Sequence, residues 1–313
     1  MQEPRSDTRQ ESVDAGGSPA GERPEGEGVN VAADLVKRVD SGVLWLTLNR
    51  PDSANALTPG MRDELSAALE DASGDLGVRC VVITAEGTKG FCTGADLRAT
   101  SRGASYARGV QQVAGGAPRP QGAPEHTLGD AARTIRKGWQ RLVEAVLDCE
   151  KPVVAGVNAT AAGGGMHLAL ACDIVIAAQE ARFIEVFVRR GLAPDAGGAY
   201  LLARLIGPQR AKELFFFGDD LSAKEAYRIG LVNRVVPRLE LRETLAEVSQ
   251  RLARSPTKAI GVAKRLVNQS LEVDRATSFW EEAAAQELVN ATVDAREGMM
   301  SFVERREPDF KGW

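Results

Sequence analysis

Three consecutive glycines, Gly163 to Gly165, stand between an apolar segment and a segment that favours a helix. Residues 153–157 are rich in valine and predict a buried strand, and Met166 to Ala171 predict a helix of small residues. Glycine lets other groups approach the main chain, and a helix start exposes N–H groups with a partial positive charge. Such a turn suits a carbonyl oxygen that becomes negative during a reaction. The glycines would also be needed if they only let a helix pack closely on a sheet.

A second glycine-containing turn, Gly90 to Leu97, follows another short apolar run at residues 80–84. We expect the two turns to lie together and to direct N–H groups at one oxygen atom. Asp195, between Pro194 and Ala196, could cap a helix that begins at Ala196.

Composition is that of an ordinary globular protein, with 43% hydrophobic and 26% charged residues in 313. The net charge of -4 gives no indication of a nucleic-acid or membrane-surface partner. Without a signal-peptide core or a membrane-spanning run, we expect a cytoplasmic protein. Few histidines and scattered cysteines predict no metal site and free, buried thiols at Cys80, Cys92, Cys149 and Cys172.

The chain divides into three parts. Residues 1–30 are acidic and rich in glycine and proline, which predicts a disordered tail. Residues 31–237 alternate strands with helices, and residues 238–313 predict successive helices without a strand. The fold class is therefore α/β with an added helical region. Within the central part, residues 98–129 lack periodicity and predict a long mobile loop over a site.

Local patterns define several elements of the central part. Residues 35–39 and 43–48 predict a hairpin. Thr58 before Pro59 predicts a helix start, and Ser222 begins a capping box for a helix that ends at Gly230, before a strand over 231–236. Two apolar stripes at helical spacing complete the pattern, namely Met61, Leu65, Ala68, Leu69 and Ala72, and Ile135, Trp139, Leu142, Val143 and Val146.

From Leu46 to Phe310 the sequence resembles the enoyl-CoA hydratase/isomerase family, also called crotonases. Six segments carry the resemblance in the family's order and spacing: Asn49-Arg-Pro with Asn55-Ala-Leu57, Phe91 to Leu97, Gly163 to Gly165 with Ala171 to Ile174, Pro194 to Gly198, Ala226 to Val236, and Glu297-Gly-Met with Phe302 to Arg306. The resemblance implies a spiral of ββα units and a C-terminal helical region that forms trimers or dimers of trimers. It also implies an acyl-CoA thioester substrate and no separate cofactor, because coenzyme A is part of the substrate.

By position, the resemblance assigns roles to individual residues. The N–H groups of Ala95 and Gly164 would bind the thioester oxyanion. Coenzyme A and the acyl group would contact a larger set, with Ser53, Ala54 and Ala56 along the coenzyme A channel, Asp96 and Leu97 near adenine and pantetheine, and Gly163, Phe187 and Pro194 elsewhere in the substrate site.

The resemblance also bears on the reaction. Hydratases of the family use two glutamates, and this chain has His167 and Phe187 at those positions. Asp195 stands where isomerase-type relatives carry their acid, among them dienoyl-CoA isomerases and ring-epoxide isomerases. One carboxylate is sufficient to remove a proton and return it further along a conjugated system. We therefore expect isomerisation of an unsaturated acyl-CoA through Asp195.

Several alternatives stay open. A hydratase could use Asp195 with His167 or Glu185, although His167 could equally be a hydrogen-bonded core residue. A hydrolytic or dehalogenase-like reaction could use Asp195 as nucleophile. The chain could also be a non-catalytic acyl-CoA-binding or scaffolding protein, while its negative charge disfavours RNA binding.

Overall fold

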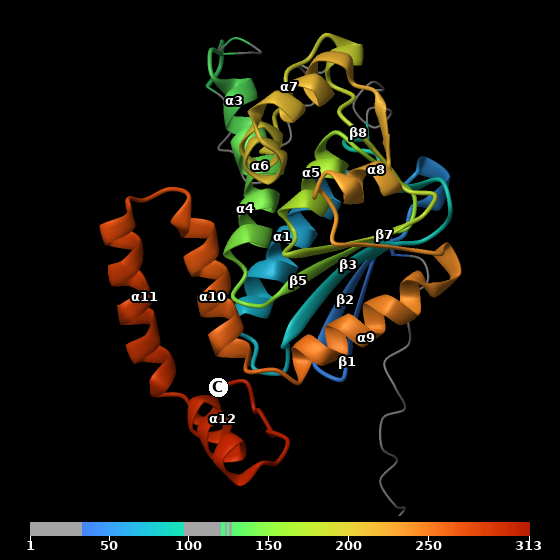
Figure 1. Cartoon of the computed structure of the whole chain (residues 1–313). Coiled ribbons are helices and arrows are strands. Elements are labelled where there is room, and N and C mark those ends of the chain that lie inside the picture. Colours follow the sequence, from blue (N-terminus) through green and yellow to red (C-terminus); the bar gives the residue numbers. More distant parts are fainter. Residues whose placement is uncertain (1–32, 97–119, 123, 125–126) are drawn as a thin grey trace, which may run out of the picture.

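The computed structural model describes residues 33–96, 120–122, 124 and 127–313. The predicted acidic tail, most of the predicted loop over 98–129, and Leu97 lie outside these residues. Within the described part, two sheets and the helices around them form the central body, and a group of helices extends from it at the C-terminal end (Figure 1).

The main sheet has the strand order β1-β2-β3-β5-β7-β10. The predicted hairpin is confirmed, since β1 (Leu35–Asp40) pairs antiparallel with β2 (Val43–Leu48). From β2 onward every pairing is parallel. The remaining strands are β3 (Cys80–Ala85), β5 (Val153–Val157), β7 (Ile174–Ala178) and β10 (Arg234–Val236).

A second sheet has the order β4-β6-β8-β9. It consists of three-residue strands, which are β4 (Gly90–Cys92), β6 (Thr160–Ala162), β8 (Arg182–Ile184) and β9 (Asp220–Ser222). The strands β3, β5 and β7 of the main sheet are each followed by one of these short strands and then by a helix. This repeat of strand, short strand and helix is the spiral of ββα units that the resemblance implied.

The predicted cap of the first helix is confirmed, because Met61 N donates to Thr58 Oγ1 over 3.2 Å at the start of α1 (Pro59–Gly74). The next helical stretch runs through α3 (Asp130–Ile135), a π-helical turn (Arg136–Gln140) and α4 (Arg141–Asp148). The glycine-rich segment begins α5 (Gly164–Ala171). Three more helices follow, namely α6 (Gly198–Ile206), α7 (Pro208–Phe217) and α8 (Ala223–Arg228), the last capped by Ser222 as predicted.

The main sheet is covered on both faces because its strand residues alternate between two apolar clusters. One cluster joins Leu46, Val81 and Val153 to α1 and α4, and the other joins Val82, Val154 and Ile176 to α9 (Leu241–Ala253). Figure 1 shows α9 crossing the sheet on the side opposite α1 and α4. The first helix beyond residue 237 therefore packs on the central sheet.

Three further helices, α10 (Thr257–Ser270), α11 (Arg275–Asn290) and α12 (Val293–Glu304), confirm the predicted helical region. Arg79 joins this region to the sheet, since its guanidinium donates to Thr257 Oγ1 and to the main-chain oxygens of Ser255 and Phe310. The helices α10 to α12 carry large apolar side chains that are exposed in the single chain, among them Val267, Leu271, Phe279, Trp280, Leu288, Phe302 and Val303.

All four cysteines are free and buried, as predicted. Burial raises the pKa of the Cys92 thiol to about 12. In the part of the chain that the structure describes, no helix is long and apolar enough to cross a membrane. The same residues contain no group of three His, Cys, Asp or Glu side chains placed to hold a metal ion.

Candidate active site

The two glycine-containing turns meet at one edge of the second sheet. Because β4 and β6 are parallel neighbours, their carboxyl ends lie together, and the turns at Gly94 and Gly163 follow directly from those ends. A Cβ atom on Gly94 would lie 3.3 Å from Ala162 O and 3.7 Å from Gly164 N. The turns are thus in direct contact, as the sequence predicted.

Main-chain alternation sets the direction of the Ala95 N–H group. On one side of the turn, Leu57 N donates to Gly94 O over 2.8 Å, and Asp96 N donates to Leu57 O over 3.0 Å. Successive groups of an extended chain point to opposite sides, so the Ala95 N–H points away from Leu57 and toward the Gly164 turn. No hydrogen bond to another described residue occupies it.

Gly164 supplies the second donor. It is the first residue of α5, and an N–H group in the first turn of a helix has no acceptor within that helix. Among the described residues, this N–H group has no acceptor elsewhere. The helix dipole adds a partial positive charge at this end. Ala95 and Gly164 therefore present two N–H groups that one oxygen atom could accept together.

Close packing requires glycine beside these donors. A Cβ atom on Gly165 would lie 2.1 Å from Cys92 O, a main-chain atom at the end of β4, and one on Gly164 would lie 2.9 Å from the Trp139 ring. Gly163 has a φ of 52°, which favours glycine. The glycines thus allow close packing and also leave the N–H donors exposed. The two interpretations of the glycines, as a donor turn and as a packing requirement, therefore do not exclude each other.

Arg50 attaches the preceding loop to the same edge. Its guanidinium pairs with Asp96 at 2.8 Å and donates to Ala56 O at 2.7 Å. The buried Asn55 side chain donates to Gly90 O at 2.7 Å, and its oxygen accepts from Arg50 N. These contacts hold Ala54 and Asn55 with positive φ values of 47° and 55°. The loop is thereby fixed as one wall of a pocket.

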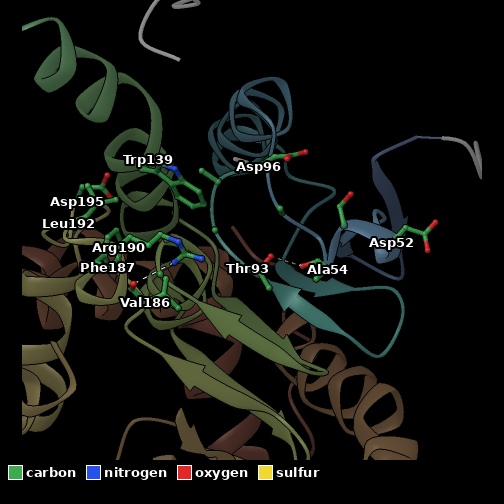
Figure 2. Close-up of a pocket in the computed structure, with 16 residues that line it drawn as sticks. Asp52, Ala54, Thr93, Asp96, Trp139, Val186, Phe187, Arg190, Leu192 and Asp195 are labelled. Carbon is green, nitrogen blue, oxygen red and sulfur yellow. Dashed lines mark hydrogen bonds between the residues drawn. The ribbon is translucent and has the colours of Figure 1, made fainter. Parts of the chain in front are cut away.

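The opposite wall consists of side chains from three separate elements. Phe187 and Arg190 come from the 3₁₀ helix Val188–Arg190 and its N-cap, Asp195 comes from the loop before α6, and Trp139 comes from the π-helical turn (Figure 2). Figure 2 shows Asp195 and Phe187 on the side of the pocket opposite Asp52 and Ala54. Together the walls enclose a pocket of about 420 Å³.

Asp195 does not cap the following helix. The helix α6 begins at Gly198, its N-cap residue is Gly197, and no side chain caps it. Asp195 instead lines the pocket, and its main-chain oxygen accepts a hydrogen bond of 3.3 Å from Gln140 Nε2. The carboxyl group is therefore held in the same pocket as the two N–H groups.

His167 and Glu185 form a buried pair behind the pocket wall. The distance between His167 Nε2 and Glu185 Oε1 is 2.9 Å, and both side chains are 0% exposed. The imidazole stacks on Phe187 with 5.5 Å between ring centres. Neither residue lines the pocket. Of the two predictions for His167, the structure agrees with the hydrogen-bonded core residue, and it places Phe187 between the pair and the pocket.

The structure brings most of the predicted site residues to this pocket: Ser53, Ala54, Ala56, Ala95, Asp96, Gly163, Gly164, Phe187 and Asp195. Pro194 does not line it, and Leu97 lies outside the described residues. Sequence reasoning missed seven lining residues: Asp52, Thr93, Gly94, Trp139, Val186, Arg190 and Leu192. Three of them, Asp52, Gly94 and Val186, stand next to an assigned residue, which could have indicated them. Trp139 fitted the buried helix stripe, which concealed its position in the pocket.

A ββα spiral that holds two free N–H groups over a pocket is the arrangement of the crotonase fold. The model of the enoyl-CoA hydratase/isomerase family matches residues 38–115 and 121–313. The chain therefore belongs to the enoyl-CoA hydratase/isomerase family, and it is an enzyme of the crotonase superfamily.

Individual relatives agree with this assignment. The chain is 35% identical to a probable enoyl-CoA hydratase of Rhodobacter capsulatus over 88% of this chain and 96% of that protein. It is 34% identical to the 1,2-epoxyphenylacetyl-CoA isomerase of Escherichia coli over 89% of this chain and 98% of that protein. The crystal structure of an enoyl-CoA hydratase from Bacillus anthracis matches with a TM-score of 0.78 and 32% identity over 90% of this chain and 100% of that chain. Relatives of similar identity thus include both hydratases and an isomerase.

Proposed function

We propose that this enzyme shifts a double bond in an unsaturated acyl-CoA, with Asp195 as the acid and base. One observation carries the proposal: Asp195 lies in the wall opposite the loop of residues 52–56, in the pocket that also holds the Ala95 and Gly164 N–H groups. The other described carboxyl groups of the pocket are placed differently. Asp96 pairs with Arg50, and Asp52 lies across the pocket from Asp195 (Figure 2).

The proposed reaction needs no group beyond these. The thioester oxygen accepts hydrogen bonds from Ala95 and Gly164, which makes a C–H group of the conjugated system acidic. Asp195 takes this proton while the bonding electrons move into the dienolate, and it then returns the proton to a carbon further along the chain. One such N–H donor contributes on the order of 3 kcal/mol to the transition state. A positioned general base contributes about 10²- to 10⁴-fold in rate.

Hydration receives less support because it must also place and activate a water molecule. The sequence left His167 and Glu185 as candidates for a second group. In the structure they contact each other at 0% exposure, and Phe187 stands between them and the pocket. A hydratase that used either residue would have to open this buried pair.

Product analysis tests the proposal. The purified protein is incubated separately with crotonyl-CoA, a 3-enoyl-CoA and a 3,5-dienoyl-CoA, and absorbance and product mass are followed. We expect a shifted double bond at unchanged mass. A gain of one water in mass would instead identify a hydratase.

The role of Asp195 is tested with Asp195→Asn. We expect kcat to fall about 10²- to 10⁴-fold while KM stays within about threefold, because the amide cannot accept the proton. Asp219→Asn removes an exposed carboxyl outside the pocket and serves as the control. Near wild-type turnover of Asp195→Asn on every accepted substrate would contradict the assignment.

We also propose that α10 to α12 join copies of the chain into a trimer or a dimer of trimers. The apolar side chains on these helices support this, because burial against another copy would remove them from water. We expect no separate cofactor, since the N–H groups and Asp195 suffice for the proposed steps. Light scattering after size-exclusion chromatography measures the assembly, and a monomer at micromolar concentration would contradict it.

A further inference from the structure

Two adjacent arginines in the 3₁₀ helix Val188–Arg190 have different surroundings. Arg189 pairs with Asp220 at 2.8 Å, away from the pocket. Arg190 lines the pocket together with Phe187, Leu192 and Asp195, and Figure 2 shows its guanidinium directed toward the pocket interior. The active-site wall therefore carries a positive charge for which the proposed proton transfer has no use.

The Arg190 guanidinium keeps most of its hydrogen-bonding capacity. Its one hydrogen bond to a described residue reaches Val186 O at 3.5 Å, the long limit for such a bond. No described carboxylate forms an ion pair with it. Arg190 is also the only basic residue among the described residues that line the pocket. Its donors are thus available to a bound molecule.

A guanidinium with free parallel N–H groups binds a carboxylate through two hydrogen bonds, with both charge and geometry matched. The side of the pocket decides where that carboxylate belongs. Arg190 stands with Asp195 and Leu192, across from Ala54 and the loop that would line the coenzyme A channel (Figure 2). An anion that reaches Arg190 from a thioester held by Ala95 and Gly164 would therefore belong to the acyl chain.

We propose that Arg190 binds a carboxylate on the acyl chain, so that the preferred substrates are acyl-CoA thioesters of dicarboxylic acids. Such a substrate brings a negative charge into the pocket of Asp195, and the cation of Arg190 offsets the repulsion between them. This inference rests on the proposed use of the pocket for acyl-CoA, but not on which reaction follows binding. Arg190 acts here as a specificity-determining residue.

Calorimetric binding of two saturated thioesters tests the inference. Adipoyl-CoA and hexanoyl-CoA have equal chain length and no double bond, so neither can be isomerised or hydrated. We expect the wild-type enzyme to bind adipoyl-CoA about tenfold more tightly than hexanoyl-CoA. This is the gain expected from a partly exposed ion pair between the Arg190 guanidinium and the substrate carboxylate. Arg190→Gln should abolish this preference, whereas Arg189→Gln, which removes the neighbouring guanidinium and its surface pair, should retain it.

Each other outcome is informative. Equal affinity for the two thioesters in the wild type would overturn the inference. An equal loss for both thioesters in Arg190→Gln, absent when 3′-dephospho-coenzyme A replaces coenzyme A, would assign Arg190 to the coenzyme A phosphate and also overturn it. Failure to bind either thioester would contradict the acyl-CoA assignment of the pocket itself, independently of Arg190.

Discussion

The two walls of the pocket are built in different ways. At the edge of the second sheet, main-chain N–H groups of Ala95 and Gly164 form the proposed binding element, and glycines and the Arg50 contacts hold it. We call this the backbone wall. On the opposite side, Phe187, Arg190 and Asp195 present side chains from a short 3₁₀ helix and a loop. We call this the side-chain wall.

The difference separates two tasks. We propose that the backbone wall binds the thioester oxygen of any substrate, because its donors belong to the main chain and do not depend on side-chain identity. The side-chain wall decides what happens next, since one substitution there removes or adds an acid, a cation or an apolar surface. Loss of an N–H donor in the backbone wall should therefore lower activity on all substrates, and changes to the side-chain wall should alter the proton-transfer step or the substrate preference.

After Asp195→Asn, the largest effect is expected from Gly165→Ala. Its Cβ would lie 2.1 Å from Cys92 O, so α5 and β4 must separate and the Gly164 donor moves away from Ala95. Loss of one donor predicts about a 10²- to 10³-fold fall in kcat for every substrate. Steady-state kinetics on at least two thioesters measures it, with circular dichroism to verify folding.

The matched control is Gly74→Ala, at the end of α1, where an added Cβ meets nothing within 4 Å. It should leave activity unchanged. Full activity of a folded Gly165→Ala variant would break the distinction between the walls.

Substitutions in the buried pair of His167 and Glu185, behind the side-chain wall, should lower the stability of the fold more than the rate of catalysis. Glu185→Leu leaves His167 without its buried hydrogen-bond partner, which predicts a loss of about 1 to 3 kcal/mol in unfolding free energy. Glu185→Gln keeps a hydrogen-bonding side chain and should lose clearly less. Urea denaturation measures both.

The same variant separates the two reaction hypotheses. Per folded molecule, Glu185→Gln should retain turnover within about threefold, since we assign proton transfer to Asp195. A far larger loss would favour the hydratase alternative.

A smaller effect is expected from Arg50→Met in the backbone wall. The variant removes the contacts of the guanidinium with Asp96 and Ala56 O, so the loop of residues 52–56 loses part of its support. We expect kcat/KM to fall on the order of tenfold, as for one or two partly buried hydrogen bonds to a charged group. Arg38→Met, which removes an exposed pair with Asp40, is the control. Equal kinetics of the two variants would show that Arg50 does not order the site.

The smallest effect is expected from thiol alkylation. Cys92 ends β4 beside the donor turn, and burial raises its pKa to about 12. Because this folded-state pKa lies far above pH 8, the thiol stays protonated there and should not react with iodoacetamide. Mass spectrometry should find the native protein unmodified and fully active, and all four cysteines modified in urea. Rapid native labelling of Cys92 would show that the backbone wall opens to solvent.

Local patterns in the sequence determined the elements that carry the backbone wall. The valine-rich strand, the Thr58 cap and the two glycine turns depend on neighbours within a few residues, so their signals are complete in short segments. Burial of the cysteines could also be predicted from the sequence, because their neighbours along the chain are mostly apolar. The order and spacing of six segments along the chain, which include the glycine turns and Asp195, suggested the family.

Only the tertiary structure showed which residues join Phe187 and Asp195 around the pocket. The strands β4, β6 and β8 have three residues each, too few for a periodic signal, and they form because parallel neighbours pair with them. His167 could have entered the pocket or the core, and its contact with Glu185, eighteen positions away, placed it in the core. Trp139 and Arg190 reach the pocket because separate elements converge there. Such contacts join residues that are distant in the chain, so packing determines them and no local pattern does.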